Sequence, residues 1–148
     1  MNRLSRAGFT LIELLIVIAI IAILASLVMA AAHSVQTKGA RSRAEAEIAA
    51  IAAALESYKA DIGDYPSNST IGSSTNLVAA LMPTNTPGAK IYFEFKNKFL
   101  SNNNYLDPFF NSYNYIYTNG SPNNGANNYD LWSTAGGSAN SNTWIKNW

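Results

Sequence analysis

A chain of 148 residues with a formal net charge of +1 is long enough for one small domain and one long helix, and it has no basic excess for binding nucleic acid. It contains no cysteine, which excludes a disulfide framework, a thiolate metal site and a cysteine nucleophile. Apolar residues are concentrated near the N-terminus, whereas residues 97–148 are rich in Asn, Ser, Gly, Tyr and Trp, so the C-terminal part should have a small, largely aromatic core.

The first predicted element is an apolar helix that begins at Phe9. Residues 9–32 form a run of 24 residues with a single charged side chain, Glu13. As a helix this run is about 36 Å long, enough to cross a hydrocarbon layer of about 30 Å. A secretory signal sequence has a shorter apolar region of about 7–15 residues, so the length favours a retained span. Cleavage after Ala30-Ala31-Ala32, which would leave His33 as the first residue, is the competing interpretation.

Glu13 is the one residue of this run that needs a partner. A carboxylate at mid-membrane costs about 2.5–3.5 kcal/mol, and less near the interface. The run contains no basic residue, and the nearest one in sequence is Arg6. Cleavage before Phe9 would create an α-amino group that is mostly protonated near neutral pH. This amine would lie four residues from Glu13 on its own chain, and it would also be able to meet Glu13 of a neighbouring chain.

Residues 6–13, with the sequence RAGFTLIE, resemble the recognition motif of prepilin peptidase in type IV pilins and type II secretion pseudopilins. The resemblance implies cleavage between Gly8 and Phe9. It also implies that Phe9 becomes the N-methylated first residue of the mature subunit. In the same way, it implies that Glu13 neutralises the N-terminus of a neighbouring subunit during assembly.

The helix is predicted to continue beyond the apolar run, to about Lys59. Residues 33–59 contain no proline, and their many alanines favour a helix. We therefore expect a single helix from about Phe9, whose second half is amphipathic and packs under a head. The apolar residues that recur at helical spacing on one face are Ala44, Ile48, Ile51, Leu55 and Tyr58.

The head is predicted to follow a turn at Gly63 and Pro66, because glycine accepts a positive φ and proline cannot continue the helix. Strands after helices, joined by short connections, indicate an α+β fold in which the long N-terminal helix packs on a small C-terminal antiparallel β-sheet, which is the pilin fold of the resembled family. The expected elements are a helix over 76–82 with Asn76 as its N-cap, a β-prone run over 90–95, a strand in which Tyr113, Tyr115 and Tyr117 alternate, and strands over 129–133 and 143–148.

The head also resembles the major pseudopilin of type II secretion. Residues 107–115, DPFFNSYNY, are similar to an Asp-Pro-Trp-Gly-x-x-Tyr-x-Tyr pattern of that family. There the last loop binds calcium through acidic side chains. Calcium prefers about six to eight oxygen ligands with carboxylates among them, so we expect no tight calcium site and no other cofactor. The corresponding loop of this chain contains Gly136, Gly137, Ser138, Asn140 and Asn142. The weak candidate ligands for calcium are Asp130, Leu131 and Ser133. The Asn side chains should instead form hydrogen bonds to the loop's own backbone.

These patterns divide the chain into four predicted segments. Residues 1–8 are a leader that prepilin peptidase would remove, and residues 9–32 are the transmembrane and filament-core half of the helix. Residues 33–60 are its amphipathic half, and residues 61–148 are an exported globular head with a short helix and an antiparallel sheet. Basic residues flank both ends of the span and do not orient it. The resemblance implies a single-pass protein of the bacterial inner membrane with its head outside the cytoplasm, and a periplasmic or surface filament after assembly.

The resemblance implies a structural subunit that polymerises into a type II secretion pseudopilus for protein export. The implied partners are further copies of the chain through the N-terminal helices, prepilin peptidase, an assembly platform and ATPase, minor pilin-like subunits and the membrane. A type IV pilus subunit for adhesion, motility or DNA uptake is the alternative within the class, and a membrane-anchored or secreted binding module is the alternative outside it. The sequence has no P-loop, GxSxG, HExxH or CxxC motif, and no catalytic residue or nucleic-acid partner is expected.

Overall fold

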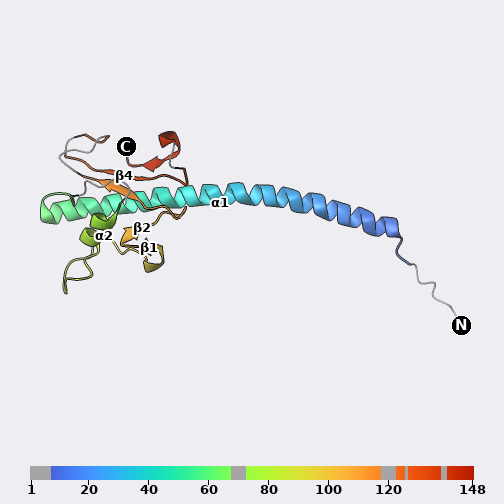
Figure 1. Cartoon of the computed structure of the whole chain (residues 1–148), viewed down its shortest axis with the longest axis horizontal. Helices are drawn as coiled ribbons and strands as arrows, with labels where there is room; N and C mark the ends of the chain where they lie inside the picture. The colour runs from blue at the N-terminus through green and yellow to red at the C-terminus, as the bar shows by residue number, and fades with distance from the viewer. Residues whose placement is uncertain (1–7, 68–72, 118–122, 126, 138–139) are drawn as a thin grey trace. The chain divides into compact units, whose positions relative to one another are not determined.

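The computed structural model describes residues 8–67, 73–117, 123–125, 127–137 and 140–148. Most of the predicted leader, residues 1–7, and Ser138 of the predicted calcium loop lie outside the described residues. The chain divides into two compact units, Met1–Lys38 and Gly39–Trp148. Helix α1, Leu11–Ile62, contributes residues to both units (Figure 1).

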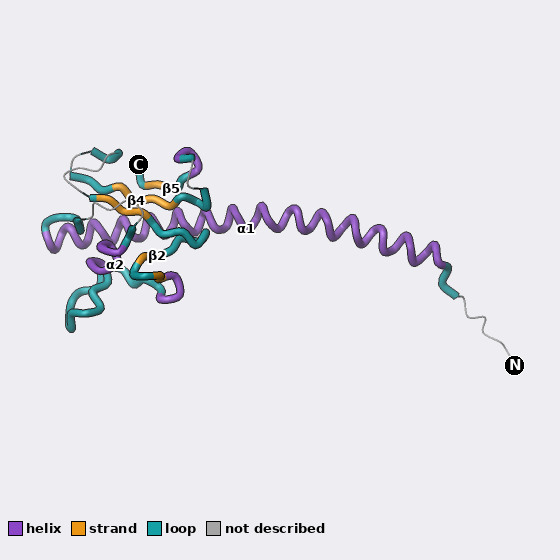
Figure 2. The backbone as a smooth tube through the Cα atoms, viewed as in Figure 1, coloured by secondary structure: helices purple, strands orange, loops and turns teal. Residues whose placement is uncertain are grey.

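Helix α1 has 52 residues and matches the predicted long helix, beginning at Leu11 rather than Phe9 and ending at Ile62 rather than Lys59. Figure 2 shows it as one continuous helix. The helix ends at Gly63, which adopts a φ of 98° and donates its N–H to the Lys59 carbonyl at 2.8 Å. A glycine at this position has no Cβ to clash in the left-handed conformation, so the predicted stop signal is confirmed.

The second unit contains two small antiparallel sheets, so the predicted α+β arrangement is confirmed (Figure 1). One sheet is a two-stranded hairpin, β1–β2, and the other has the order β3-β4-β5. Tyr115 of β3 lies opposite Leu131 of β4, and Ser133 of β4 lies opposite Ile145 of β5. The elements after α1 are α2 Thr75–Leu81, the 3-10 turn η1 Asn97–Phe99, β1 Leu100–Ser101, β2 Asn104–Tyr105, β3 Asn114–Ile116, β4 Asp130–Ser133, the 3-10 turn η2 Ser141–Thr143 and β5 Ile145–Lys146.

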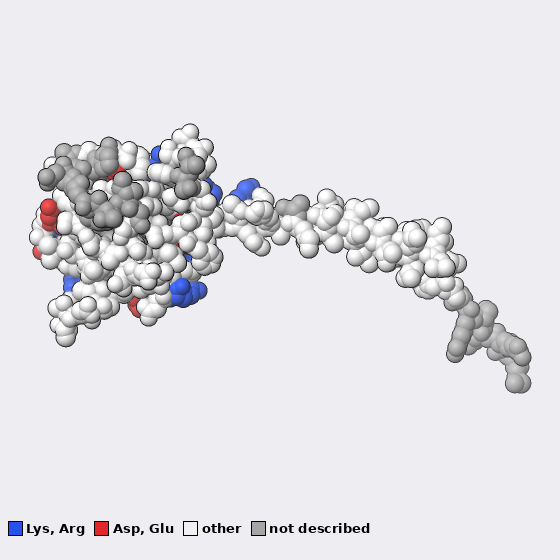
Figure 3. Space-filling view, in the orientation of Figure 1, with Lys and Arg blue, Asp and Glu red and all other residues white. Residues whose placement is uncertain are grey.

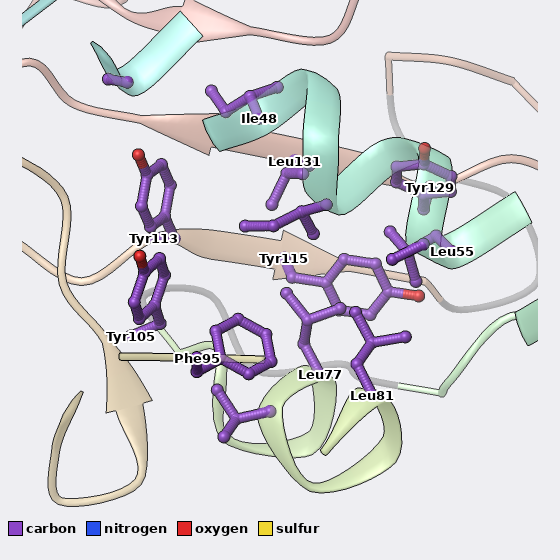
Figure 4. Close-up of a cluster of buried hydrophobic side chains, with 14 of the residues drawn as sticks. Ile48, Leu55, Leu77, Leu81, Phe95, Tyr105, Tyr113, Tyr115, Tyr129 and Leu131 are labelled. Carbon is purple, nitrogen blue, oxygen red and sulfur yellow. The ribbon is translucent and has the colours of Figure 1, made fainter. Parts of the chain in front are cut away.

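The core of the second unit is aromatic, as expected, and it is built on the predicted stripe of α1 (Figure 4). Tyr113 and Tyr115 are fully buried. Their hydroxyls are satisfied, since Tyr113 donates to Glu47 at 2.9 Å and Tyr115 donates to the Pro66 carbonyl at 2.8 Å. Each tyrosine therefore contributes buried ring area together with a hydrogen bond to α1 or to the segment just after it. The buried residues of the α1 stripe are Ala44, Ile48, Ile51 and Leu55, and Tyr58 is half-buried.

Two local predictions are wrong. Residues 90–95 form no strand, because their backbone bonds elsewhere: the N–H groups of Tyr92 and Phe93 both donate to the Leu81 carbonyl at the end of α2. Asn76 does not cap α2, which begins one residue earlier, at Thr75. Ser74 stands at the N-cap position without a side-chain cap, because its hydroxyl instead accepts the Tyr105 N–H at 2.8 Å and so ties the helix to β2.

Candidate functional site

The predicted processing and assembly residues lie together at the start of α1. Gly8, Phe9 and Thr10 precede the helix, and Glu13 is in its first turn. The Glu13 carboxylate accepts the Thr10 backbone N–H at 2.8 Å and the Thr10 hydroxyl at 2.7 Å. The Thr10 hydroxyl in turn accepts the Glu13 N–H at 3.3 Å, and the Thr10 carbonyl accepts the Leu14 N–H at 3.3 Å. This reciprocal pattern is a capping box, with Thr10 as the N-cap.

Thr10 caps α1, a role that the sequence analysis missed. The signal was present, because Thr10 and Glu13 have the Ser/Thr-x-x-Glu spacing of a capping box. A cation was the expected partner of Glu13, whereas the structure gives its carboxylate two neutral donors, the Thr10 N–H and hydroxyl. A negative charge in the first turn also interacts favourably with the helix dipole. Glu13 therefore has local partners that do not depend on cleavage of the chain.

The apolar part of α1 is uncovered. Large apolar side chains from Leu11 to Met29 are between 47% and 88% exposed, and Phe9 is 85% exposed. On the face shown in Figure 3, this part of the helix carries no basic or acidic side chain. By length and composition α1 is able to cross a membrane, although a signal sequence near an N-terminus passes the same test. A helix that is apolar on every side needs lipid or other helices around it.

The weak metal candidates of the head are all in β4, and their oxygens are committed to protein donors. Asp130 is fully buried, and its carboxylate accepts the side-chain amide of Asn123 at 2.7 Å and the backbone N–H groups of Asn123 and Asn124 at 3.2 and 3.1 Å. The Leu131 carbonyl accepts the Asn147 N–H at 3.1 Å. Among the residues that the structure describes, no group of three or more His, Asp or Glu side chains could hold a metal ion. The oxygen donors of these described candidates do not make a set that fits calcium.

Ser133, the third candidate, belongs to a buried pair that the sequence analysis missed. Its hydroxyl donates to the Asp107 carboxylate at 2.5 Å, and both residues are fully buried. The other Asp107 oxygen accepts the N–H groups of Phe109 and Asn111, each at 2.9 Å. Asp107 therefore holds the turn of residues 107–111 and connects it to β4.

The loop that would bind calcium in the resembled family is held here by groups of the chain itself. Asn140 accepts the Asn142 N–H at 3.0 Å through its side chain, which confirms the expected role for that asparagine. The Trp144 ring N–H donates to the Gly137 carbonyl at 3.1 Å. Arg41 of α1 donates to the Thr143 carbonyl at 2.8 Å and ties the loop to the helix.

The acidic residues at the end of α1 have structural partners. Asp61 pairs with Lys90 at 2.5 Å, and this ammonium, with a hydrogen bond from Tyr92, holds the pKa of the Asp61 carboxyl below its usual value. The Tyr117 hydroxyl donates to Asp64 and, with the Tyr65 N–H, lowers the pKa of that carboxyl too. Both carboxyls fasten the helix end to the segments that follow it. These contacts support a structural role for Asp61 and Asp64.

Two family models match the chain. A model described as a prokaryotic N-terminal methylation motif matches residues 3–29, and a model described as type II secretion system (T2SS), protein G, matches residues 32–148. The first of these covers the cluster of Gly8, Phe9, Thr10 and Glu13. The second covers the amphipathic half of α1 and all of the head.

Curated proteins named type II secretion system core protein G are similar to the chain. The protein from Pseudomonas aeruginosa is 45% identical over 67 residues, and that from Klebsiella michiganensis is 42% identical over 66 residues. These alignments cover 45% of this chain in both cases, and 47% and 46% of the two relatives. The protein from Klebsiella pneumoniae is 37% identical over 87 residues, which is 59% of each chain. The chain thus spans about half the length of the curated relatives it matches.

Proposed function

Because the chain belongs to the type II secretion system protein G family, we propose that it is a structural subunit that polymerises into a type II secretion pseudopilus and so serves protein export. The observation that supports this most is the apolar part of α1, whose side chains from Leu11 to Met29 are exposed in the single chain. Such a surface is stable only in lipid or among other helices. A filament subunit uses both surroundings in turn.

Before assembly the subunit is anchored in the inner membrane by α1, with its head outside the cytoplasm. The capping box makes this state less costly, because the Glu13 carboxylate accepts the Thr10 N–H and hydroxyl, and the Thr10 hydroxyl oxygen accepts the Glu13 N–H. Glu13 lies in the first turn of the helix, so in a span it would be near the interface rather than at mid-membrane.

Prepilin peptidase then cuts between Gly8 and Phe9. These residues lie outside the helix and are exposed, so the peptide bond is accessible without unfolding of α1. The cut frees the α-amino group of Phe9, which directly precedes Thr10, and the family motif implies that this amine is methylated. A methylated amine keeps its positive charge and is still able to pair with a carboxylate.

Assembly moves the apolar helix from lipid into a bundle of sister helices. Lipid chains are as apolar as leucine, so this transfer gains little from hydrophobic burial itself. Packing and charge pairing therefore decide the position of each added subunit. The Glu13 carboxylate of one subunit pairs with the Phe9 amine of its neighbour, because either charge buried alone would oppose addition by several kcal/mol.

The other components that this process needs are inferred from the family to which the chain belongs. It includes prepilin peptidase, an assembly platform with its ATPase, and minor pilin-like subunits. The chain itself has a structural role, and we assign no catalytic residue to it. A type IV pilus subunit remains the second candidate within the class, and the matches to secretion proteins favour the pseudopilus over it.

The test is to express the full chain in a cell that has a type II secretion machinery and to examine sheared material for filaments of this subunit. A matched strain without the assembly ATPase is the control. Filaments that depend on the ATPase are the expected result. Wild-type subunit that stays in the membrane at normal levels, without filaments in either strain, would overturn the proposal.

A further inference from the structure

Phe110 occupies the tip of a rigid turn in an unfavourable backbone conformation. Its φ is 64°, in the left-handed region that favours glycine and asparagine and disfavours bulky side chains. The turn is fixed by Asp107. Its carboxylate accepts the N–H groups of Phe109 and Asn111, and its backbone carbonyl accepts the N–H of Phe110 itself. The conformation is therefore set by the turn, and the chain places an aromatic ring where the backbone resists one.

Among the described residues of the head, the Phe110 ring does not pack on the hydrophobic core. It is 75% exposed and is not among the residues that pack on the core, whereas its neighbour Phe109 is. Within the described part of the head it is the most exposed large apolar side chain, ahead of Ile62 and Ile91. An aromatic side chain that costs stability and is largely exposed is expected to make its contact outside the chain.

The same head carries an uncharged pocket that is partly apolar and large enough for an aromatic ring. This pocket has a volume of about 310 Å³ and lies between α2 and the β1–β2 hairpin. Its apolar lining comes from Val78, Ala79, Met82 and Leu100, and none of its lining residues is charged. No residue of the 107–111 turn lines the pocket, so Phe110 does not fill it within one chain. The remaining lining residues are Thr75, Thr84, Asn85, Asn97 and Asn103.

We infer that Phe110 of one subunit inserts into the α2–hairpin pocket of a neighbouring subunit. The Phe110 ring, here called the knob, and the pocket are different surfaces of the same chain, so the contact between subunits is heterologous. A repeated heterologous contact builds an open helical assembly unless its rotation closes a ring. A filament subunit requires a contact of this kind. The inference rests on the proposed function and adds a second, head-to-head interface to the contacts of the helices.

Disulfide trapping tests the contact directly, because the chain has no cysteine of its own. The full chain with Asn111→Cys beside the intact Phe110 and Asn85→Cys in the exposed lining of the pocket, assembled by the secretion machinery and then oxidised, should give a ladder of covalent multimers. Each single variant should give dimers at most. A disulfide needs Cα atoms within about 7 Å, so the ladder reports the proposed pairing. Asn111→Cys combined with Lys146→Cys, an exposed position in β5 of the other sheet, is the matched control and should give no ladder.

Filament yield gives an independent measurement. Phe110→Gly removes the knob and Ala79→Trp fills the pocket, and each should lower the yield on the order of tenfold at equal subunit level, as the loss of an aromatic anchor does. Phe110→Gly should leave the head folded, because glycine is favoured at this φ. Normal filaments from both variants, together with no ladder from the paired cysteines, would overturn the inference and leave the proposed function standing. Absence of filaments from the wild-type chain would overturn both.

Discussion

The Glu13 carboxylate and the Thr10 residue before the helix satisfy each other, with the carboxylate accepting the Thr10 N–H and hydroxyl at 2.8 and 2.7 Å. This contact holds the Glu13 carboxylate at the first turn of α1, four residues after Phe9, where the chain is predicted to be cut. The same residue is thus able to serve two states: it caps its own helix before assembly, and it offers a charge to a neighbour afterwards. The two roles call for different properties, since capping needs an acceptor and pairing needs a negative charge.

We expect the mature chain to begin at Phe9. Cleavage there creates a cation four residues before Glu13, at the start of an apolar run that contains no basic side chain of its own. Mass spectrometry of the intact subunit from cells with prepilin peptidase should show an N-methylated Phe9. A Gly8→Leu variant, which alters the residue before the cut, should keep its leader. A mature chain that starts at His33 would instead show signal-peptide cleavage and a secreted head.

The head should fold without calcium. The Asp130 and Asp107 carboxylates are committed to donors of the chain, and the loop is tied by Arg41 and Trp144. All three tryptophans lie in the head, so fluorescence melts of the full chain in detergent report on the head alone. Melting temperatures with calcium and with a chelator should coincide within error. A rise of several degrees with calcium would show that backbone and amide oxygens are sufficient ligands after all.

The long helix and the main sheet could be predicted from the sequence because their signals are local and repeated. The stripe that includes Ile48 and Ile51 has helical spacing, and Gly63 marks the helix end. The β1–β2 hairpin was missed because each strand has only two residues, too few for a period to show. Its Asn102 and Asn103, both with positive φ, were the available turn signal.

The candidate site was predictable to the extent that its contacts are close in sequence. Gly8, Phe9 and Glu13 came from a motif, and the role of Thr10 is visible in the same eight residues. The Asp107–Ser133 pair was not predictable, because its two members are 26 residues apart and meet only when the turn packs on β4. Its burial explains why an acidic residue of the head is unavailable as a metal ligand.

Phe110→Gly should stabilise the head. A left-handed backbone costs an L-residue about 1–2 kcal/mol, and the extra unfolded-state entropy of glycine returns about 0.5–1 kcal/mol of this, so the net gain should be about 0.5–1 kcal/mol. Ile91→Gly is the matched control, because Ile91 is also exposed but does not have a positive φ. It should destabilise the head. Chemical denaturation followed by tryptophan fluorescence measures both, and a destabilised Phe110→Gly would mean that the ring packs in solution.

The head should lose stability at alkaline pH. Burial, with the nearby Glu47 carboxylate, raises the pKa of Tyr105 from 10.0 to about 12, and burial with Glu56 does the same for Tyr129. A raised pKa in the folded state contributes stability that is present below pH 10 and is lost as the pH rises toward 12. Melts across this range, with tyrosinate absorbance recorded alongside, should show the decline. Tyr105→Phe should make the slope shallower, and tyrosines that all titrate near pH 10 with unchanged fluorescence would contradict the prediction.

Glu13→Gln and Thr10→Val should separate the two roles of the helix start. Glutamine keeps an oxygen that is able to accept the Thr10 N–H, so the cap survives while the charge is lost. Valine removes the hydroxyl and costs about 1 kcal/mol of capping, but it leaves the Glu13 charge in place.

If charge pairing with the Phe9 amine drives assembly, Glu13→Gln should lower filament yield by tenfold or more, since an unpaired amine in an apolar bundle costs several kcal/mol. Thr10→Val should lower it far less. Yields are compared at equal subunit level, with processing before Phe9 verified by mass spectrometry. The opposite ranking, with Glu13→Gln assembling and Thr10→Val failing, would assign Glu13 to capping and remove the ion pair from the mechanism.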